Sequence, residues 1–331
     1  MPSTPRILML GTGDFALPTF LHLCETGHQV VELVTQPDRP QGRKQELIPS
    51  WIKVAATERG IPVFQPDDIN CPASLDAIRL LKPDVMVTAA YGQILSADLL
   101  TIPRLGGINL HGSILPAYRG AAPVARAIER GETETGVTVI LMNPRVDAGG
   151  MIRVARTPID PDETAGELEA RLAVLGAPLI AATLAELAAG TARVLPQERS
   201  RVTKAPKLRK EDGLIDWSKP ARAVHDQVRA MQPWPVAFTF WHRAYNPEHE
   251  PLRLIVHRTR PLDSSGVSGQ APGTVLESAG DRLVVAAASG SVRLETIQVI
   301  GKKPMPAADF LRGHPVLPGD RFGPPGTSPP P

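Results

Sequence analysis

Short apolar runs alternate with amphipathic segments along the first 190 residues. Runs with the length of buried strands lie at 6–10, 29–35 and 84–90, and segments with apolar residues at helical spacing lie at 15–27, 50–60 and 73–83. Ser50 is a suitable N-cap, and Gly27 and Gly60 stand where helices commonly end. This order of strands and helices predicts an α/β domain with a doubly wound parallel sheet.

The pattern continues with two more strands, expected at 136–143 and 151–159, and a long Ala- and Leu-rich helix at 163–189. Beyond it comes one amphipathic helix, followed by five short strands separated by polar turns. These strands are expected at 236–242, 252–258, 273–278, 282–288 and 292–300. Five short strands predict a small OB-like β-barrel, a fold that often binds nucleic acid.

The expected organisation therefore has four parts. They are an α/β domain at 1–190, a linker at 191–207, the five-stranded barrel domain at 208–318 and a disordered Pro-rich tail at 319–331. The linker shows neither the helical nor the strand period. The tail has almost nothing to bury.

Composition narrows the classes of function. The chain has two cysteines without C-x-x-C spacing, so it predicts neither a disulfide framework nor a thiolate metal site. None of its eight histidines forms an H-x-x-x-H or H-E-x-x-H pattern, and no metal is expected. The apolar stretch at the N-terminus is too short for a secretory signal, and no apolar run approaches a membrane span. We expect a cytoplasmic monomer that contacts no membrane.

The charge is uneven along the chain. Residues 201–331 carry 18 Lys and Arg against 12 Asp and Glu, or +6, so residues 1–200 carry 18 against 22, or −4. A solvated basic surface explains this modest bias. That is the more frequent case for a modest bias, and the alternative is a C-terminal module that meets a polyanion.

A Gly-rich turn, "GTGDFA" at 11–16, follows the first strand and fits G-x-G-x-x-A. A dinucleotide site in a Rossmann-like sheet also needs an acidic residue at the end of the second strand. That strand ends in Thr35 and Gln36, with Glu32 inside it. The fingerprint is incomplete, and a tight turn from strand to helix is at least as good an interpretation.

The segment "INLHGS" at 108–113 is a candidate for chemistry. Period-2 alternation places Asn109 and His111 on the same face of a strand. Asp147 follows the next strand, and the carboxyl ends of parallel strands meet at one edge of a sheet. The three side chains are therefore expected to meet. The spacing alone leaves open whether they form a catalytic triad or whether His111 is a satisfied core histidine, because polar residues are common at strand ends.

The segment that contains these residues resembles the folate-dependent formyltransferases. It reads "INLHGSILPAYRGAAPVARAIERGETETGVTVILMNPRVDAGGMI". Further segments resemble the methionyl-tRNA formyltransferases in order and spacing, and extend the resemblance over residues 6 to about 320: "TQPDRPQGR", "VFQP", "DVMVTAAYGQIL", "GLIDWS" and "PGTVLE".

The resemblance implies transfer of the formyl group of 10-formyltetrahydrofolate to the α-amino group of methionyl initiator tRNA. The catalytic residues would be Asn109, His111 and Asp147. The folate would be bound by Tyr91, Gly92, Gln93, Ile94, Leu95, Ser113, Ile114, Leu115 and Pro116. The tRNA would be bound by Arg39, Arg43, Lys44, Lys207, Lys302 and Lys303, the first three from a long loop at 36–49.

The sequence departs from the family pattern at two glycines. The family usually has Pro in place of Gly13, and a second Asp in place of Gly150. The loop is also less basic than expected after Arg43, because Gln45 and Glu46 follow. Affinity for tRNA could therefore depend more on the C-terminal domain.

Three alternatives remain open from the residues. A formyltransferase that acts on a small amine, such as an amino sugar nucleotide, would share the triad but would not need a basic barrel. A nicotinamide-dependent oxidoreductase would use "GTGDFA" but lacks the ribose acid. A non-catalytic tRNA-binding protein would leave the three polar residues unexplained.

Overall fold

The computed structural model describes residues 4–41, 46–246, 248–262 and 269–326. Their contacts form two compact units, and neither is one continuous stretch of chain. The N-terminal unit comprises Met1–Pro123, Glu134–Pro158 and Glu167–Ala205, and the C-terminal unit comprises Val124–Thr133, Ile159–Gly166 and Pro206–Pro331. The expected domain limits stay a prediction, and the two units are described separately below.

One seven-stranded sheet forms the centre of the N-terminal unit. Its order is β5 (Val63–Phe64), β2 (Gln29–Val34), β1 (Arg6–Gly11), β6 (Val85–Ala89), β7 (Gly107–His111), β8 (Glu134–Leu141) and β9 (Met151–Pro158). The first five strands are parallel, which confirms the predicted α/β sheet. β8 and β9 are antiparallel to their neighbours. The sequence did not indicate this change of direction.

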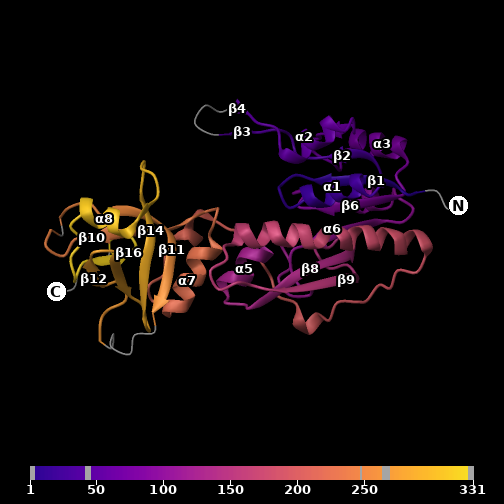
Figure 1. The fold of residues 1–331 in the computed structure, drawn as a ribbon. Coiled ribbons are helices and arrows are strands. Elements are labelled where there is room, and N and C mark those ends of the chain that lie inside the picture. Colours follow the sequence, from indigo (N-terminus) through magenta and orange to yellow (C-terminus); the bar gives the residue numbers. More distant parts are fainter. Residues whose placement is uncertain (1–3, 42–45, 247, 263–268, 327–331) are drawn as a thin grey trace. The chain divides into compact units, whose positions relative to one another are not determined.

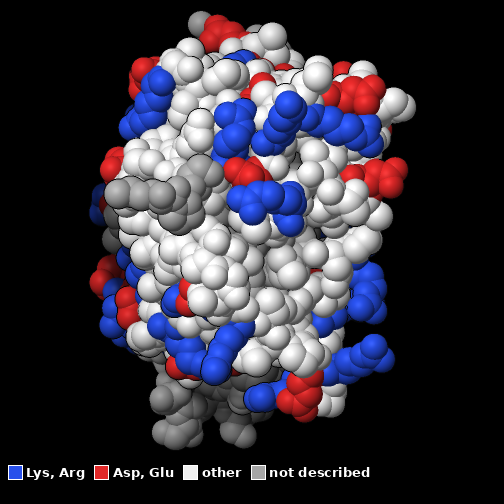
Figure 2. Space-filling view, turned by 90° about the vertical axis from the view of Figure 1, so that its right-hand side faces the viewer, with Lys and Arg blue, Asp and Glu red and all other residues white. Residues whose placement is uncertain are grey.

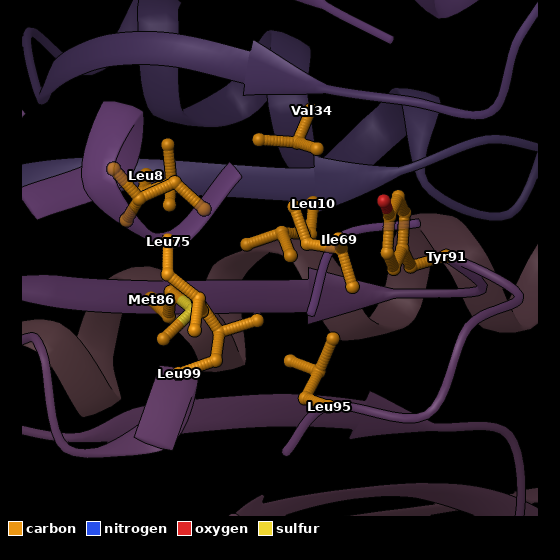
Figure 3. Close-up of a cluster of buried hydrophobic side chains, with 10 residues drawn as sticks. Leu8, Leu10, Val34, Ile69, Leu75, Met86, Tyr91, Leu95 and Leu99 are labelled. Atoms are coloured by element: carbon orange, nitrogen blue, oxygen red, sulfur yellow. The ribbon is translucent and has the colours of Figure 1, made fainter. Parts of the chain in front are cut away.

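Helices bury the apolar residues of this sheet. They are α1 (Leu17–Glu25), α2 (Trp51–Glu58), α3 (Pro72–Leu81), α4 (Ala97–Leu100) and α6 (Ala165–Ala189). Leu8 and Leu10 lie two positions apart on β1 and therefore share a face. They pack with Met86 of β6 and Leu75 of α3 in a buried cluster (Figure 3).

The long helix α6 packs on β7 (Figure 1). A β-carbon at Gly176 would lie 2.4 Å from Leu110 Cδ2, so the close approach of helix and strand needs glycine there. By length and composition alone, α6 would also pass as a membrane span. Seven of its apolar residues are buried within the protein: Ala165, Leu168, Leu172, Ala173, Ala177, Ile180 and Leu184.

An antiparallel sheet curls through the C-terminal unit. Its order is β12 (Val275–Ala279), β13 (Arg282–Ala286), β14 (Ser291–Val299), β11 (Leu252–Leu262), β10 (Ala237–His242) and β16 (Arg321–Gly323), with β15 (Met305–Pro306) beside β14. The five expected strands are confirmed as β10 to β14. Phe322 N donates to Gly273 O at 2.7 Å, and Val275 N donates to Asp320 O at 2.8 Å, so the last strand returns to the first. This closure fits an OB-like barrel.

The C-terminal unit also contains four short helical elements. They are α5 (Pro123–Glu129), which belongs to this unit from Val124 onward, η2 (Lys210–Gly213), α7 (Ala221–Ala230) and α8 (Ala307–Gly313). A further short helix, η1 (Arg199–Arg201), lies near the end of the N-terminal unit. The amphipathic helix expected after the linker is α7. Its Ala221, Val224 and Val228 are buried.

The start of the expected disordered tail is ordered. Asp320 is fully buried and accepts hydrogen bonds from Trp241 Nε1 at 2.8 Å, Ala244 N at 2.8 Å and Leu317 N at 2.9 Å. β16 follows directly and pairs with β10. The expectation of disorder is therefore wrong for residues 320–323, because a buried carboxylate fixes them. Residues 327–331 lie outside the described part of the chain.

Candidate functional site

Strand β7 presents its polar residues on the face opposite α6. Leu110 points to the helix, so Asn109 and His111 share the other face, as the alternation predicts. The His111 side chain is buried, with 5% of the residue exposed, and Asn109 is half-buried. An amide and an imidazole therefore lie side by side at the end of a strand in the sheet.

A hydroxyl on the neighbouring strand orients the amide. Thr88 of β6 is paired with Asn109 and donates from Oγ1 to Asn109 Oδ1 at 2.7 Å. This bond uses the carbonyl side of the amide and turns Nδ2 away from Thr88. Within the described residues, Nδ2 makes no hydrogen bond to protein, so it is free to donate to a ligand.

Both ring nitrogens of His111 face oxygen atoms. Nε2 lies 2.9 Å from the carbonyl oxygen of Tyr118, and Nδ1 lies 3.5 Å from Asp147 Oδ1. Only the doubly protonated ring donates toward both oxygens at once. The ring is therefore held between a backbone carbonyl and a carboxylate.

Asp147 reaches His111 by a different path from the expected one. β8 is antiparallel to β7, so its carboxyl end, Leu141, lies opposite Ile108 and not opposite His111. The loop at 142–150 then returns to His111. There Gly120 N donates to Asp147 Oδ2 at 2.8 Å. The three residues do come together, but the convergence of parallel strand ends was the wrong reason.

The loop at 142–150 has a backbone that admits little substitution. Asp147 has a φ of +49°, a left-handed conformation that non-glycine residues seldom adopt. A β-carbon at Gly149 would lie 1.7 Å from Leu141 O, and one at Gly150 would lie 2.2 Å from Val194 Cγ1. Val194 thus fills the space that the family's second aspartate would need. At Gly13 a β-carbon would meet nothing within 4 Å, so packing does not exclude the usual proline.

The predicted linker contacts this loop. Gln197 Nε2 donates to the backbone oxygens of Asp147 at 2.8 Å and Gly149 at 2.7 Å. Gln197 Oε1 accepts from Arg119 Nε at 3.0 Å and Nη2 at 2.6 Å. Burial lowers the pKa of the Arg119 guanidinium, and the Asp147 carboxylate opposes that shift. We assigned no role to Gln197 from the sequence, where it lies in a segment without periodicity.

The residues expected to bind folate divide into two groups. Tyr91, Leu95, Ser113 and Leu115 are buried, and Gly92, Gln93, Ile94, Ile114 and Pro116 have exposed or half-exposed surface. Burial, with Asp68 nearby, raises the pKa of Tyr91 to about 12, so the hydroxyl remains protonated. It has no hydrogen-bond partner among the described residues. The Gln93 amide instead supports the chain before α3, where its Oε1 accepts from Ile69 N at 2.9 Å.

The base of the long loop at 36–49 is fixed by one carboxylate. Asp38 accepts from Lys53 and, at 3.0 Å, from Gln65 Nε2. The loop contains two short paired strands, β3 (Pro40–Gln41) and β4 (Glu46–Leu47). Arg39 is exposed, and Trp51, just beyond the loop, is 70% exposed. Arg43 and Lys44 lie outside the described residues.

The remaining candidate cations are exposed. Lys207 is the last residue of the predicted linker, and Lys302 and Lys303 follow β14. On the face drawn in Figure 2, Lys and Arg have Asp and Glu among them. Such mixing is typical of a solvated surface and not of a continuous track for phosphates.

The "GTGDFA" turn has a structural use. Thr12 Oγ1 donates to Tyr91 O at 3.0 Å and accepts from Gln36 N at 3.2 Å, so it joins the ends of β1, β2 and β6. This supports the interpretation as a tight turn. Among the residues that the structure describes, no three His, Cys, Asp or Glu side chains gather as a metal site would require.

Two family profiles match the chain. The one described as "Formyl transferase" covers residues 5–184, and the one described as "Formyl transferase, C-terminal domain" covers residues 207–315. The two matches leave out residues 1–4, 185–206 and 316–331.

Individual proteins agree with these profiles. The methionyl-tRNA formyltransferase of Citrifermentans bemidjiense is 45% identical over 318 residues, covering 96% of each chain. That of Moorella thermoacetica is 42% identical over 318 residues, covering 96% of this chain and 99% of the relative. A solved N-formyltransferase from Helicobacter canadensis, complexed with folinic acid and dTDP-3-aminofucose, has a TM-score of 0.64 at 15% identity, covering 88% and 98%. The last match concerns the fold alone.

Proposed function

The chain belongs to the formyl transferase family, and from this membership we propose that it transfers the formyl group of 10-formyltetrahydrofolate to the α-amino group of methionyl initiator tRNA. The observation that carries the choice of substrate is the near full-length similarity to methionyl-tRNA formyltransferases. That similarity extends through the C-terminal unit, since it covers 96% of this chain.

The chemistry places its main demand on the formyl carbonyl. An α-amino group titrates near pH 8, roughly, so a good part of it is a neutral nucleophile at physiological pH. Its attack on the formyl carbon makes a tetrahedral oxyanion, and one preorganised donor against such an oxygen contributes on the order of 10²- to 10³-fold in rate. In this proposal Asn109 Nδ2 is that donor, because Thr88 already holds the other side of the amide.

In this proposal a protonated His111 is the second donor beside the oxyanion. Its Nε2 proton points to Tyr118 O in the free protein, so a substrate oxygen has to share or replace that acceptor. Asp147 keeps the ring oriented. A water held by the Asp147 carboxylate would take the proton that the amine loses and pass it to N10 of the folate as the C–N10 bond breaks.

The other residues receive binding roles within the same proposal. Gly92 and Ile94 have surface available to a pterin, and the buried Ser113 and Leu115 shape the loop beside it. Arg39, Arg43 and Lys44 would position the acceptor end of the tRNA through its phosphates. We place the reaction in the cytoplasm, in a monomer.

The decisive experiment offers two acceptors to the purified protein. With 10-formyltetrahydrofolate as donor, we expect formyl-methionyl-tRNA from charged initiator tRNA and no product from an amino sugar nucleotide. His111→Ala is expected to lower kcat by at least roughly 10²-fold while folate binding persists. Formylation of the sugar alone would replace the proposed substrate, and NADH binding serves as a control for the Gly-rich turn.

A further inference from the structure

The side-chain amide of Gln197 uses all of its donors and acceptors in hydrogen bonds to Arg119 and to the loop at 142–150, which carries Asp147. Its two amide protons go to the backbone oxygens of residues 147 and 149. The two lone pairs of Oε1 accept from the Arg119 guanidinium. One neutral side chain therefore ties Arg119 to the backbone that carries Asp147.

Arg119 lies between two residues whose backbones contact His111 and Asp147. The residue before it, Tyr118, supplies the carbonyl oxygen that faces His111 Nε2. The residue after it, Gly120, supplies the N–H that binds Asp147 Oδ2. A shift of Arg119 against the loop at 142–150 would therefore disturb both contacts that orient His111.

The segment that carries Gln197 is itself fixed on both sides. Before it, Leu195 and Met151 exchange two backbone hydrogen bonds of 2.8 Å. After it, Thr203 Oγ1 accepts from Tyr118 N at 2.8 Å, and Ala205 N donates to Arg119 O at 2.7 Å. Gly120 permits this approach, since a β-carbon there would lie 2.5 Å from Ala205 O.

From these contacts we propose that Gln197 is a positioning residue of the formyl-transfer site, which acts by fixing the Asp147 loop relative to His111. The proposal rests on the proposed function for its catalytic consequence. The hydrogen bonds of the Gln197 side chain go to Arg119 and to backbone oxygens, and none goes to the side chains of Asn109, His111 or Asp147. Gln197 acts through Asp147, whose left-handed backbone makes the loop dependent on outside support.

A near-isosteric variant separates this role from simple packing. Gln197→Glu keeps the shape and keeps an acceptor for Arg119, but it removes both protons that go to the backbone oxygens of 147 and 149. Misplacement of a catalytic group by about 1 Å costs on the order of 10²-fold in rate. We expect kcat to fall roughly 10- to 100-fold, with KM for both substrates within about twofold of wild type.

The matched control is Glu198→Gln, next along the chain. Glu198 is 61% exposed and contacts Ser200 and Arg201 without touching either loop. The kcat of the Glu198→Gln variant should equal that of wild type. In a His111→Ala background, Gln197→Glu should add little further loss, because both changes act on one unit. Wild-type kcat in Gln197→Glu, or full additivity with His111→Ala, would overturn the proposal.

A measurement without substrate keeps this inference separate from the proposed function. The ring ¹⁵N signals of His111, identified by their loss in His111→Ala, should move in Gln197→Glu and remain in Glu198→Gln. If they move while wild type formylates no methionyl-tRNA, the proposed function fails and the positioning role stands. If they do not move, the positioning role fails whatever the substrate.

Discussion

The hydroxyl of Thr88 donates to Oδ1 of Asn109 at 2.7 Å, across two paired positions of neighbouring parallel strands. This bond decides which end of the amide faces the reaction. Without it, the amide could present an acceptor to the developing oxyanion, and the like charge would oppose catalysis.

Thr88→Val should therefore lower kcat while it leaves folate binding unchanged. Valine matches threonine in shape but cannot donate, so Asn109 loses its orientation. We expect a loss of about tenfold, less than the 10²- to 10³-fold expected for removing the donor with Asn109→Ala. Steady-state kinetics on both variants give the comparison. Thr88→Ser keeps the hydroxyl and should remain near wild type, and equal turnover in the Ser and Val variants would show that the bond is not used.

Gly150→Asp should destabilise the protein unless Val194 is shortened. The new β-carbon would lie 2.2 Å from Val194 Cγ1. Overpacking of this kind typically costs about 1–3 kcal/mol. We expect a lower Tm in Gly150→Asp and recovery of at least half of that loss in Gly150→Asp/Val194→Ala. Val174→Ala, on the exposed surface of α6, is the matched second change and should restore nothing.

Asp38→Asn should weaken the folded state at neutral pH and much less in acid. The hydrogen bond from Lys53 holds the pKa of Asp38 below its usual 3.8. The carboxylate therefore stabilises the fold fully above that value, and this contribution is lost as the pH falls through the lower folded pKa. For a partly exposed pair we expect about 0.5–1 kcal/mol.

Thermal unfolding of wild type and Asp38→Asn at pH 7 and near pH 3 checks this sign. Asp76→Asn is the control, because its pair with Arg79 is more exposed, with 71% of the Asp76 side chain accessible. A stability difference for Asp38→Asn that persists unchanged into acid would contradict the role of the ionised carboxylate.

Arg39→Ala should lower kcat/KM for methionyl-tRNA and leave the folate KM unchanged. A phosphate contact releases counterions, so its loss should reduce the slope of log kcat/KM against log salt by about 0.7–0.9. Kinetics at several salt concentrations measure this slope. Arg79→Ala removes an exposed cation on α3 and should leave the slope unaltered. An equal loss of folate binding in Arg39→Ala would relocate this residue to the folate site.

Periodicity predicted most of the framework because the core requires it. Buried strands need apolar runs, and the two-residue period placed Asn109 and His111 on one face. The direction of a strand does not produce a pattern of this kind, because the apolar residues of β8 would have the same order in a parallel and in an antiparallel sheet. The path that brings Asp147 to His111 therefore depends on the conformation of the loop at 142–150, which hydrophobic periodicity does not predict.

The segment at 191–207 was expected to be a linker without secondary structure for a similar reason. Its role depends on single backbone bonds and on one amide, Gln197, which create no repeat along the sequence. The role of Thr88 was missed for another reason. It lies within an apolar strand, where a single threonine is usually interpreted as a residue that only packs in the core.

The division of the chain into spatial units limits how this enzyme can be taken apart or recombined. α5 belongs to the C-terminal unit from Val124 onward, and there Arg126 binds Asp212 at 2.6 Å. Residues 159–166 belong to it as well, with Gly166 N bonded to Gln232 O at 3.0 Å. A chimera that replaces only the residues after 205 would leave residues 124–133 and 159–166 packed against a barrel from another protein. Successful domain exchange in this protein therefore requires three exchanged segments, and gene fusion or splitting at a single point carries a built-in mismatch.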